Sequence, residues 1–171
     1  METKGKAKLI DSIENLLTGE KKQNALAFAK FLIELRMTPQ WASENSWSVS
    51  YRGKRICYIK ILIRMKETEN LWYIRPAIQY EKKFEEFCVS EHMEQIMLEN
   101  VHYCISCGKC APGKTVVFWG KKLEHVCCAP IDFEFHNPDS SLLEYIKRII
   151  IFQREKIVSE IVEKRDRREW L

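Results

Sequence analysis

The chain has 171 residues and a formal net charge of +4, from 28 Lys and Arg against 24 Asp and Glu. Hydrophobic residues make up 46% of the chain and charged residues 30%, which excludes a disordered or fibrous protein. No apolar run approaches the roughly 20 residues of a membrane-spanning helix, and no signal-peptide pattern follows the charged N-terminus. We therefore expect a cytoplasmic protein with one domain over residues 1–171.

Two helices are expected before the first strand. The polar residues 18–20 separate a helix over 9–17 from a second helix over 20–36. Apolar side chains recur in the second helix at intervals of three and four residues, which is typical of a helix that faces a core. We expect Pro39 to end this helix, because proline cannot continue the backbone hydrogen bonding.

Three strands follow the helices. Small polar and large apolar residues alternate strictly over 46–51, so the apolar side chains share one face of a strand. Arg52-Gly53 suits a two-residue hairpin loop that leads to a second strand over 54–65. On that strand the odd positions are apolar and the even positions are half basic. A third strand is predicted over 71–76, where a proline ends it.

The second half of the chain begins and ends with helices, predicted over 82–100 and 141–166. A capping box, a serine followed three residues later by glutamate, begins the last helix. Its apolar stripe leaves open a homodimer through this helix. Short strands are expected between the two helices, over 115–119, 123–128 and 131–135. Together these elements predict an α+β fold, with an antiparallel sheet of about five strands packed against helices.

Five of the seven cysteines fall in a cysteine-rich segment, residues 101–130. Cys-x-x-Cys-Gly brings two sulfurs to one metal ion, and a second pair of ligands would complete a tetrahedron. Cys110 and one cysteine of the later pair, Cys127-Cys128, fit that need. Neighbouring residues on a strand point in opposite directions, so we expect only one cysteine of the later pair to bind. The predicted ligands of a structural zinc are Cys104, Cys107, Cys110 and Cys127, with Cys128 as the alternative to Cys127.

Other uses of these cysteines stay open. Cysteine is commonly a small buried hydrophobe, and Cys104 with Cys107 would suit a thiol redox site. An iron–sulfur cluster fits less well, because the fourth cysteine of a bacterial ferredoxin run is missing. His102 and His125 are reserve metal ligands. Four sulfur ligands leave no position for water, which favours a structural over a catalytic zinc.

The strand over 54–65 also carries a basic surface. Between Tyr51 and Lys66 there are six basic residues and no acidic one. Basic side chains interleaved with an aromatic ring suit an anion, a phosphate or single-stranded nucleic acid, whereas a solvated sheet face is the simpler interpretation. The candidate ligand-binding residues are Lys54, Tyr58, Lys60 and Arg64, with the aromatic side chains Trp47 and Trp72.

Two segments carry a resemblance to known groups of proteins. Trp41, the strand from Trp47, the Gly53-Lys54 hairpin and Pro76 form a pattern that resembles the YdhG-like small bacterial proteins of unknown function. The cysteine pattern over 104–127 is similar to cysteine-rich hypothetical proteins of anaerobic Gram-positive bacteria. Neither resemblance implies an activity or a catalytic residue.

The sequence holds no phosphate-binding loop, no Gly-x-Ser-x-Gly and no His-Glu-x-x-His. We therefore expect a zinc-stabilised module without enzymatic activity that binds a small molecule or a protein on its sheet. The alternatives are a nucleic-acid-associated regulatory protein that uses the basic surface over 52–66, and a thiol redox protein. The modest net charge makes nucleic acid the less favoured partner.

Overall fold

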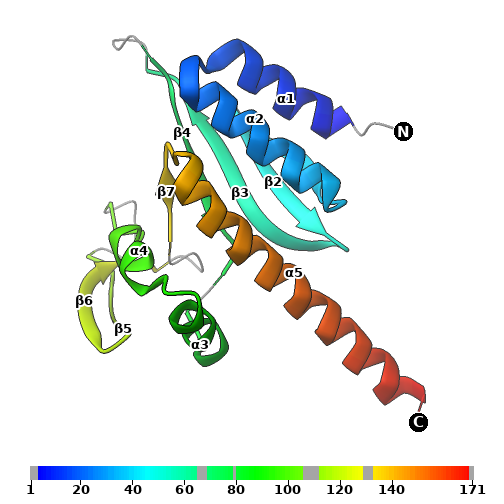
Figure 1. Ribbon diagram of the computed structural model, residues 1–171, viewed down its shortest axis with the longest axis vertical. Helices are drawn as coiled ribbons and strands as arrows, with labels where there is room; N and C mark the ends of the chain where they lie inside the picture. Colours follow the sequence, from blue (N-terminus) through cyan, green and yellow to red (C-terminus); the bar gives the residue numbers. More distant parts are fainter. Residues whose placement is uncertain (1–3, 65–68, 79, 106–111, 129–132, 170–171) are drawn as a thin grey trace. The chain divides into compact units, whose positions relative to one another are not determined.

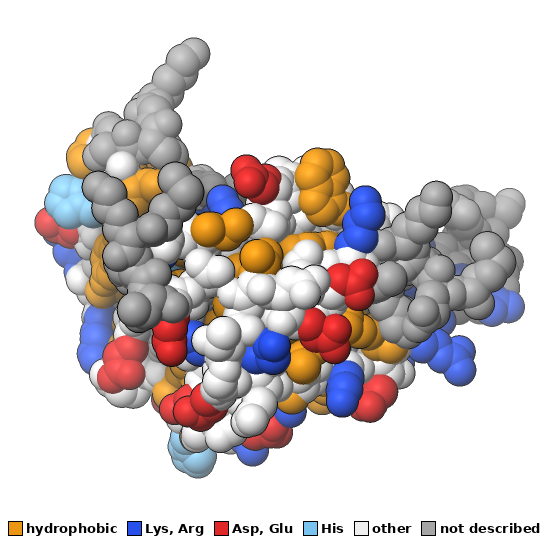
Figure 2. Space-filling view, turned by 90° about the horizontal axis from the view of Figure 1, so that it is seen from above, with side chains coloured by type: hydrophobic (Ala, Val, Ile, Leu, Met, Phe, Trp, Pro, Cys, Tyr) orange, Lys and Arg blue, Asp and Glu red, His pale blue; other side chains and the backbone are white. Residues whose placement is uncertain are grey.

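A computed structural model describes residues 4–64, 69–78, 80–105, 112–128 and 133–169. The chain divides into two compact units, residues 1–74 with 136–171 and residues 75–135. Within the described ranges no helix is both long and apolar enough to cross a membrane. Acidic and basic side chains are interspersed over the face drawn in Figure 2, so no field of one sign dominates that face.

The fold is α+β, and its main element is a five-stranded sheet in the order β1-β2-β3-β4-β7 (Figure 1). Hairpins make β1, β2 and β3 consecutive antiparallel neighbours. The predicted turn Arg52-Gly53 is confirmed, with positive φ at both residues. The strands are β1 (Thr38–Ser43), β2 (Ser46–Tyr51), β3 (Lys54–Leu62), β4 (Leu71–Pro76) and β7 (Phe135–His136).

Three helices lie on one side of this sheet: α1 (Lys4–Leu16), α2 (Gly19–Glu34) and α5 (Ser140–Glu169) (Figure 1). The apolar face of β2 is buried beneath them, as the strict alternation predicts, with Trp47 and Val49 at most 1% exposed. Phe28 of α2 contacts Trp72 of β4, with ring centroids 6.5 Å apart. Gln153 of α5 donates a hydrogen bond to the backbone of β3. These contacts form the core of the first unit.

The prediction that Pro39 ends the second helix is wrong, because the helix ends earlier and Pro39 belongs to β1. The N–H of Met37 donates to the carbonyl of Leu32 (3.0 Å), and that of Arg36 donates to Ile33 (2.9 Å). With Arg36 at a φ of 60°, this is a Schellman ending of the helix. The sequence lacks the glycine that normally marks it.

The last helix also begins differently from the prediction. The N–H of Leu142 donates to the side-chain Oδ1 of Asp139 at 2.7 Å. Asp139 therefore caps α5, in place of the predicted Ser141 box. A carboxylate is favoured at this end because the helix dipole is positive there.

The second unit contains α3 (Lys82–Ser90), α4 (Glu94–Glu99), β5 (Lys114–Phe118) and β6 (Lys121–Val126). The single helix predicted over 82–100 is interrupted at His92, which has a φ of 55° and ends α3 with a second Schellman motif. Of the predicted strand 131–135, residues 131–132 lie outside the described residues, Phe133 forms an isolated bridge with Val101, and Phe135 begins β7. The aromatic core of this unit brings together Tyr80, Phe84, Phe118, Trp119 and Phe133.

Candidate ligand-binding face and cysteine site

A β-bulge in β3 decides which side chains share a face. Val49 of β2 lies opposite Cys57, but the next residue, Ser50, lies opposite Arg55. Ile56 is therefore an extra residue in β3, with no partner in β2. Both Ile56 and Cys57 are fully buried, so the alternation of buried and exposed side chains breaks at this point.

The bulge places Lys54 on the helix-covered side of the sheet. Lys54 lies opposite Tyr51, whose ring contacts the guanidinium of Arg154 in α5 at 5.1 Å. The ammonium of Lys54 forms an ion pair with the carboxylate of Glu160, also in α5. The hydrogen bond from Lys54 holds the pKa of Glu160 below its usual value. The structure therefore separates Lys54 from Tyr58 and Lys60, with which the sequence grouped it.

Arg55 takes the place of Lys54 on the other side of the sheet, and the described helices of the first unit leave that side uncovered. We call this side the open face. Arg55 is exposed, whereas Tyr58 and Lys60 are half-buried. The register places these residues on the open face in the first three strands: Thr38 and Gln40 of β1, Ser46, Ser48 and Ser50 of β2, and Arg55, Tyr58 and Lys60 of β3. Ser46 is fully buried at this position.

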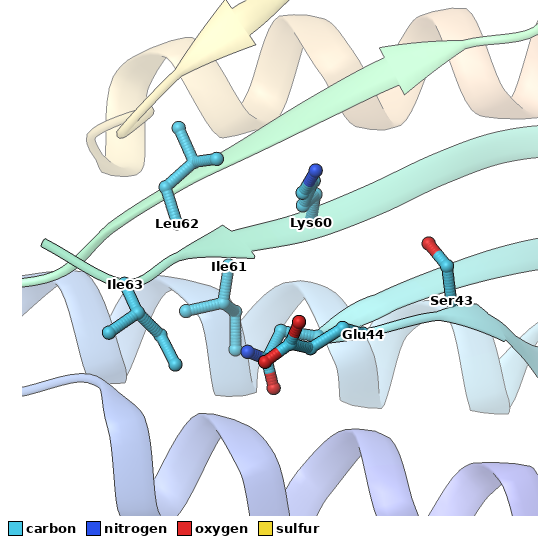
Figure 3. Close-up of a pocket in the computed structure, with 7 residues that line it drawn as sticks. Ser43, Glu44, Lys60, Ile61, Leu62 and Ile63 are labelled. Atoms are coloured by element: carbon cyan, nitrogen blue, oxygen red, sulfur yellow. The ribbon is translucent and has the colours of Figure 1, made fainter.

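A shallow hollow of about 440 Å³ lies at the end of β3, beside Lys60. Lys60 and Leu62 point to one side of the strand, and Ile61 and Ile63 point to the other (Figure 3). The turn between β1 and β2 supplies the remaining wall, including the carboxylate of Glu44. Of the apolar side chains that line the hollow, Leu62 lies on the open face and Ile61 and Ile63 lie on the other side.

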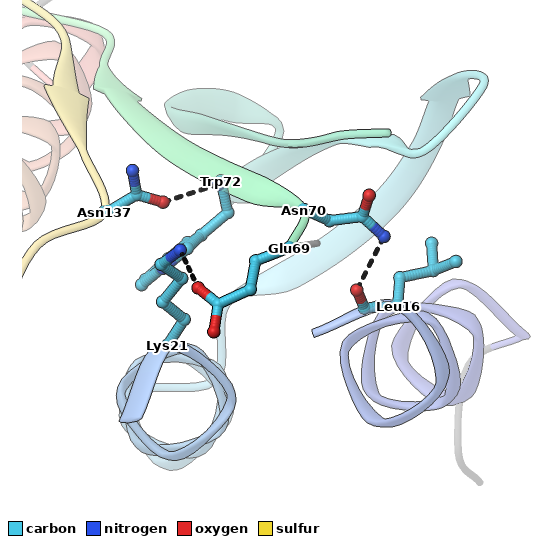
Figure 4. Close-up of polar contacts among 6 residues, drawn as sticks. All are labelled: Leu16, Lys21, Glu69, Asn70, Trp72 and Asn137. Atoms are coloured by element: carbon cyan, nitrogen blue, oxygen red, sulfur yellow. Dashed lines mark hydrogen bonds and ion pairs between the residues drawn. The ribbon is translucent and has the colours of Figure 1, made fainter. Parts of the chain in front are cut away.

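Neither Trp47 nor Trp72 lines the open face, because both are core side chains with 1% exposure. The backbone N–H of Trp72 donates to Oδ1 of Asn137 at 3.0 Å, which ties β4 to the start of α5 (Figure 4). Nearby, Asn70 donates to the carbonyl of Leu16 at 2.8 Å. Arg64 is exposed and lies beyond the end of β3.

Cys104 and Cys127 lie on two segments that pair in an antiparallel manner. The N–H of Cys104 donates to the carbonyl of His125 (2.7 Å), and that of Cys127 donates to the carbonyl of His102 (2.8 Å). Cys127 therefore lies opposite His102, which shares a strand face with Cys104. This pairing puts both sulfur-bearing residues on one face. Cys128, the next residue after Cys127, is exposed.

Gly113 brings the chain back against this pair of segments. A Cβ on Gly113 would lie 2.7 Å from the carbonyl oxygen of Val126 and 2.9 Å from the Cβ of Cys104. The two ends of segment 104–113 therefore meet. Cys107 and Cys110, the other predicted ligands, lie outside the described residues. Within the described ranges, no three His, Cys, Asp or Glu side chains lie close enough to hold a metal ion.

A carboxylate beside the cysteine site engages the reserve ligand His102. Nδ1 of His102 lies 3.3 Å from Oε2 of Glu134, which also forms an ion pair with Arg75. Glu134 is only 9% exposed, so the arginine compensates a charge that water reaches poorly. The sequence gives no signal for this cluster, since its members are far apart in the chain.

The two remaining cysteines are core thiols. Burial raises the pKa of Cys57 strongly, and burial together with Glu94 raises the pKa of Cys88 to about 12. Both therefore stay protonated at neutral pH and are poor nucleophiles. The five other cysteines, which carry any reactive thiol, all lie in the cysteine-rich segment.

The chain matches no protein-family model, no curated protein and no solved structure.

Proposed function

We propose that this protein is a binding module without enzymatic activity. Its open face holds a small molecule or a protein partner, and one structural zinc ion stabilises the segment over 101–130. The observation that carries the zinc proposal is the closure of segment 104–113 at Gly113, against the strand that bears Cys127.

Chain length supports bringing four cysteines together there. Cys107 is three residues after Cys104, and Cys110 is three residues before Gly113. Three residues of chain span at most about 11 Å, so the chain length allows both cysteines to reach the closed ends of the segment. The proposed zinc ligands are therefore Cys104, Cys107, Cys110 and Cys127.

The donor set suits a structural role for the metal. Thiolates are strong zinc ligands, and four of them complete the tetrahedral shell. Cys127 is favoured over Cys128 because its backbone pairing puts it on the same face as Cys104. His102 is engaged at Nδ1 by Glu134, which leaves Nε2 as its metal-binding atom and keeps it a reserve ligand. The zinc would stabilise the segment by linking residues 104–110 to Cys127.

The binding role rests on the one-sided packing of the sheet. Helices α1, α2 and α5 lie on one side, and the open face presents Arg55, Tyr58 and Lys60 beside a row of serines. A half-buried aromatic ring flanked by cations is a recognition surface for a polar ligand with an apolar part. Leu62, on the same side of β3 as Lys60, adds an apolar side chain to this surface.

Elemental analysis of protein purified under reducing conditions, together with titration of the thiols, tests the zinc. We expect one zinc per chain. We also expect Cys127→Ser to lose the metal and Cys128→Ser, the matched control one residue away, to keep it. Metal-free folded protein in which all five cysteines of segment 101–130 titrate would contradict the proposal and make thiol redox chemistry the better interpretation.

A further inference from the structure

The charged side chains of the five-stranded sheet are all basic. The strands contain no aspartate or glutamate and four basic residues. Two of these have acidic partners, Lys54 in Glu160 and Arg75 in Glu134. The side chains of Arg55 and Lys60 have no acidic partner in the described part of the chain. The uncompensated positive charge of the sheet therefore lies on the open face.

The two uncompensated cations flank an aromatic ring. Arg55, Tyr58 and Lys60 lie opposite three serines of β2 that are two residues apart, so successive members are separated by roughly 7 Å along the strand. A ligand with negative charge on both sides of a planar group would complement all three. The serines of β2 opposite them are small, so the side chains on β3 extend further from the sheet than those on β2.

From this arrangement we infer that the open face binds single-stranded nucleic acid. The inference rests on the proposed binding role of this face and replaces the small molecule or protein as its occupant. Phosphates would contact Arg55 and Lys60, and a base would stack on Tyr58. Single strands offer this alternation of charge and planar ring, and sheet surfaces bind them through exposed aromatic side chains. A polyglutamate chain carries the charge without an aromatic ring, and a duplex keeps its bases stacked inside.

The modest net charge of +4 is consistent with a small footprint. Acidic and basic side chains are interspersed on the face in Figure 2, so we expect no broad electrostatic attraction from that face. Two phosphate contacts predict that the logarithm of the affinity falls with the logarithm of the salt concentration at a slope of about −1.4. Glu44, in the hollow beside Lys60, limits the site at that end.

Fluorescence anisotropy with labelled single-stranded RNA and DNA of about 12 nucleotides tests the inference, since such a length is within the usual site sizes. We expect binding at low salt, and a slope that falls to about −0.7 in Arg55→Gln. Tyr58→Leu should weaken binding by about 5-fold or more, whereas Tyr58→Phe, which keeps the ring, should restore it.

Lys54→Gln is the matched control, because it removes the same charge one residue away on the helix-covered side. It should leave the affinity unchanged. Equal losses in Lys54→Gln and Arg55→Gln would overturn the assignment to the open face. Binding of polyglutamate or of a DNA duplex as tight as that of the single strands would overturn the ligand class. Absence of any single-strand binding by zinc-loaded, folded protein would refute this inference alone, since the zinc content tests the proposed module separately.

Discussion

Replacing Gly113 by alanine should destabilise the second unit more than any other glycine substitution in the described chain. The new Cβ would lie 2.7 Å from the carbonyl oxygen of Val126 and 2.8 Å from the carbonyl carbon of His125. These neighbours are backbone atoms and cannot rotate away. Overpacking of this kind costs about 1–3 kcal/mol. Gly113 also has a φ of +99°, and a left-handed backbone costs an alanine a further 1–2 kcal/mol or so.

Gly120→Ala separates the two costs. Gly120 lies in the hairpin between β5 and β6 of the same unit, with a φ of +74° and no atom within 4 Å of the added Cβ. The Gly120→Ala variant is therefore destabilised by the left-handed backbone alone, without overpacking. In a protein of this size each kcal/mol lowers the Tm by roughly 2–4 °C. Gly113→Ala should melt at least about 2 °C below Gly120→Ala.

Thermal unfolding of both variants, with zinc content measured on the same samples, is the assay. Because Gly113 closes segment 104–113, its alanine variant should also retain less zinc than Gly120→Ala. Equal melting temperatures would show that the close approach at Gly113 is not a tight contact. Equal zinc contents would show that closure of the segment does not build the metal site.

Two further outcomes follow from charge and burial. A double-mutant cycle of Lys54→Met and Glu160→Gln should give a coupling of about 0.2–1 kcal/mol, as for other partly exposed pairs. The pKa of Glu160 is lowered in the folded protein, so this stabilisation is present at neutral pH and is lost as the pH falls through that lowered pKa. Urea unfolding at pH 7 and near pH 3 measures the coupling at both ends of this range. The same coupling at both pH values would contradict the assignment. With its pKa raised to about 12, Cys88 should resist iodoacetamide at pH 8 in the folded protein and react in urea, as mass spectrometry of the labelled peptide would show.

Local patterns were sufficient to predict the β2–β3 hairpin. Its strands follow the alternation of polar and apolar residues, and Arg52-Gly53 supplies the positive φ that a two-residue turn needs. Strand β1 was missed because its sequence has no such alternation. It forms through pairing with β2, where Trp41 lies opposite Trp47, and pairing between segments is not visible in a single strand's pattern.

Helix ends were harder to predict than helices. Both Arg36 and His92 adopt the left-handed conformation that usually signals glycine, and the tertiary contacts of each helix outweigh the cost of about 1–2 kcal/mol. Asp139 caps α5 although a serine box follows it, since a charged oxygen is the stronger acceptor at a helix start. Competing signals of similar strength cannot be ranked without the packing around them.

The bulge at Ile56 explains why the candidate binding residues differ from those expected. One extra residue exchanges Lys54 for Arg55 on the open face and turns Lys54 toward Glu160. The adjacent apolar pair Ile56-Cys57 is the only trace of this in the sequence. The carbonyl of Arg55 also accepts a hydrogen bond from Gln153 of α5 at 3.2 Å. The same stretch of backbone therefore anchors the helix on one side and presents a cation on the other, so the position of Arg55 is set by the packing of α5 and not by the ligand.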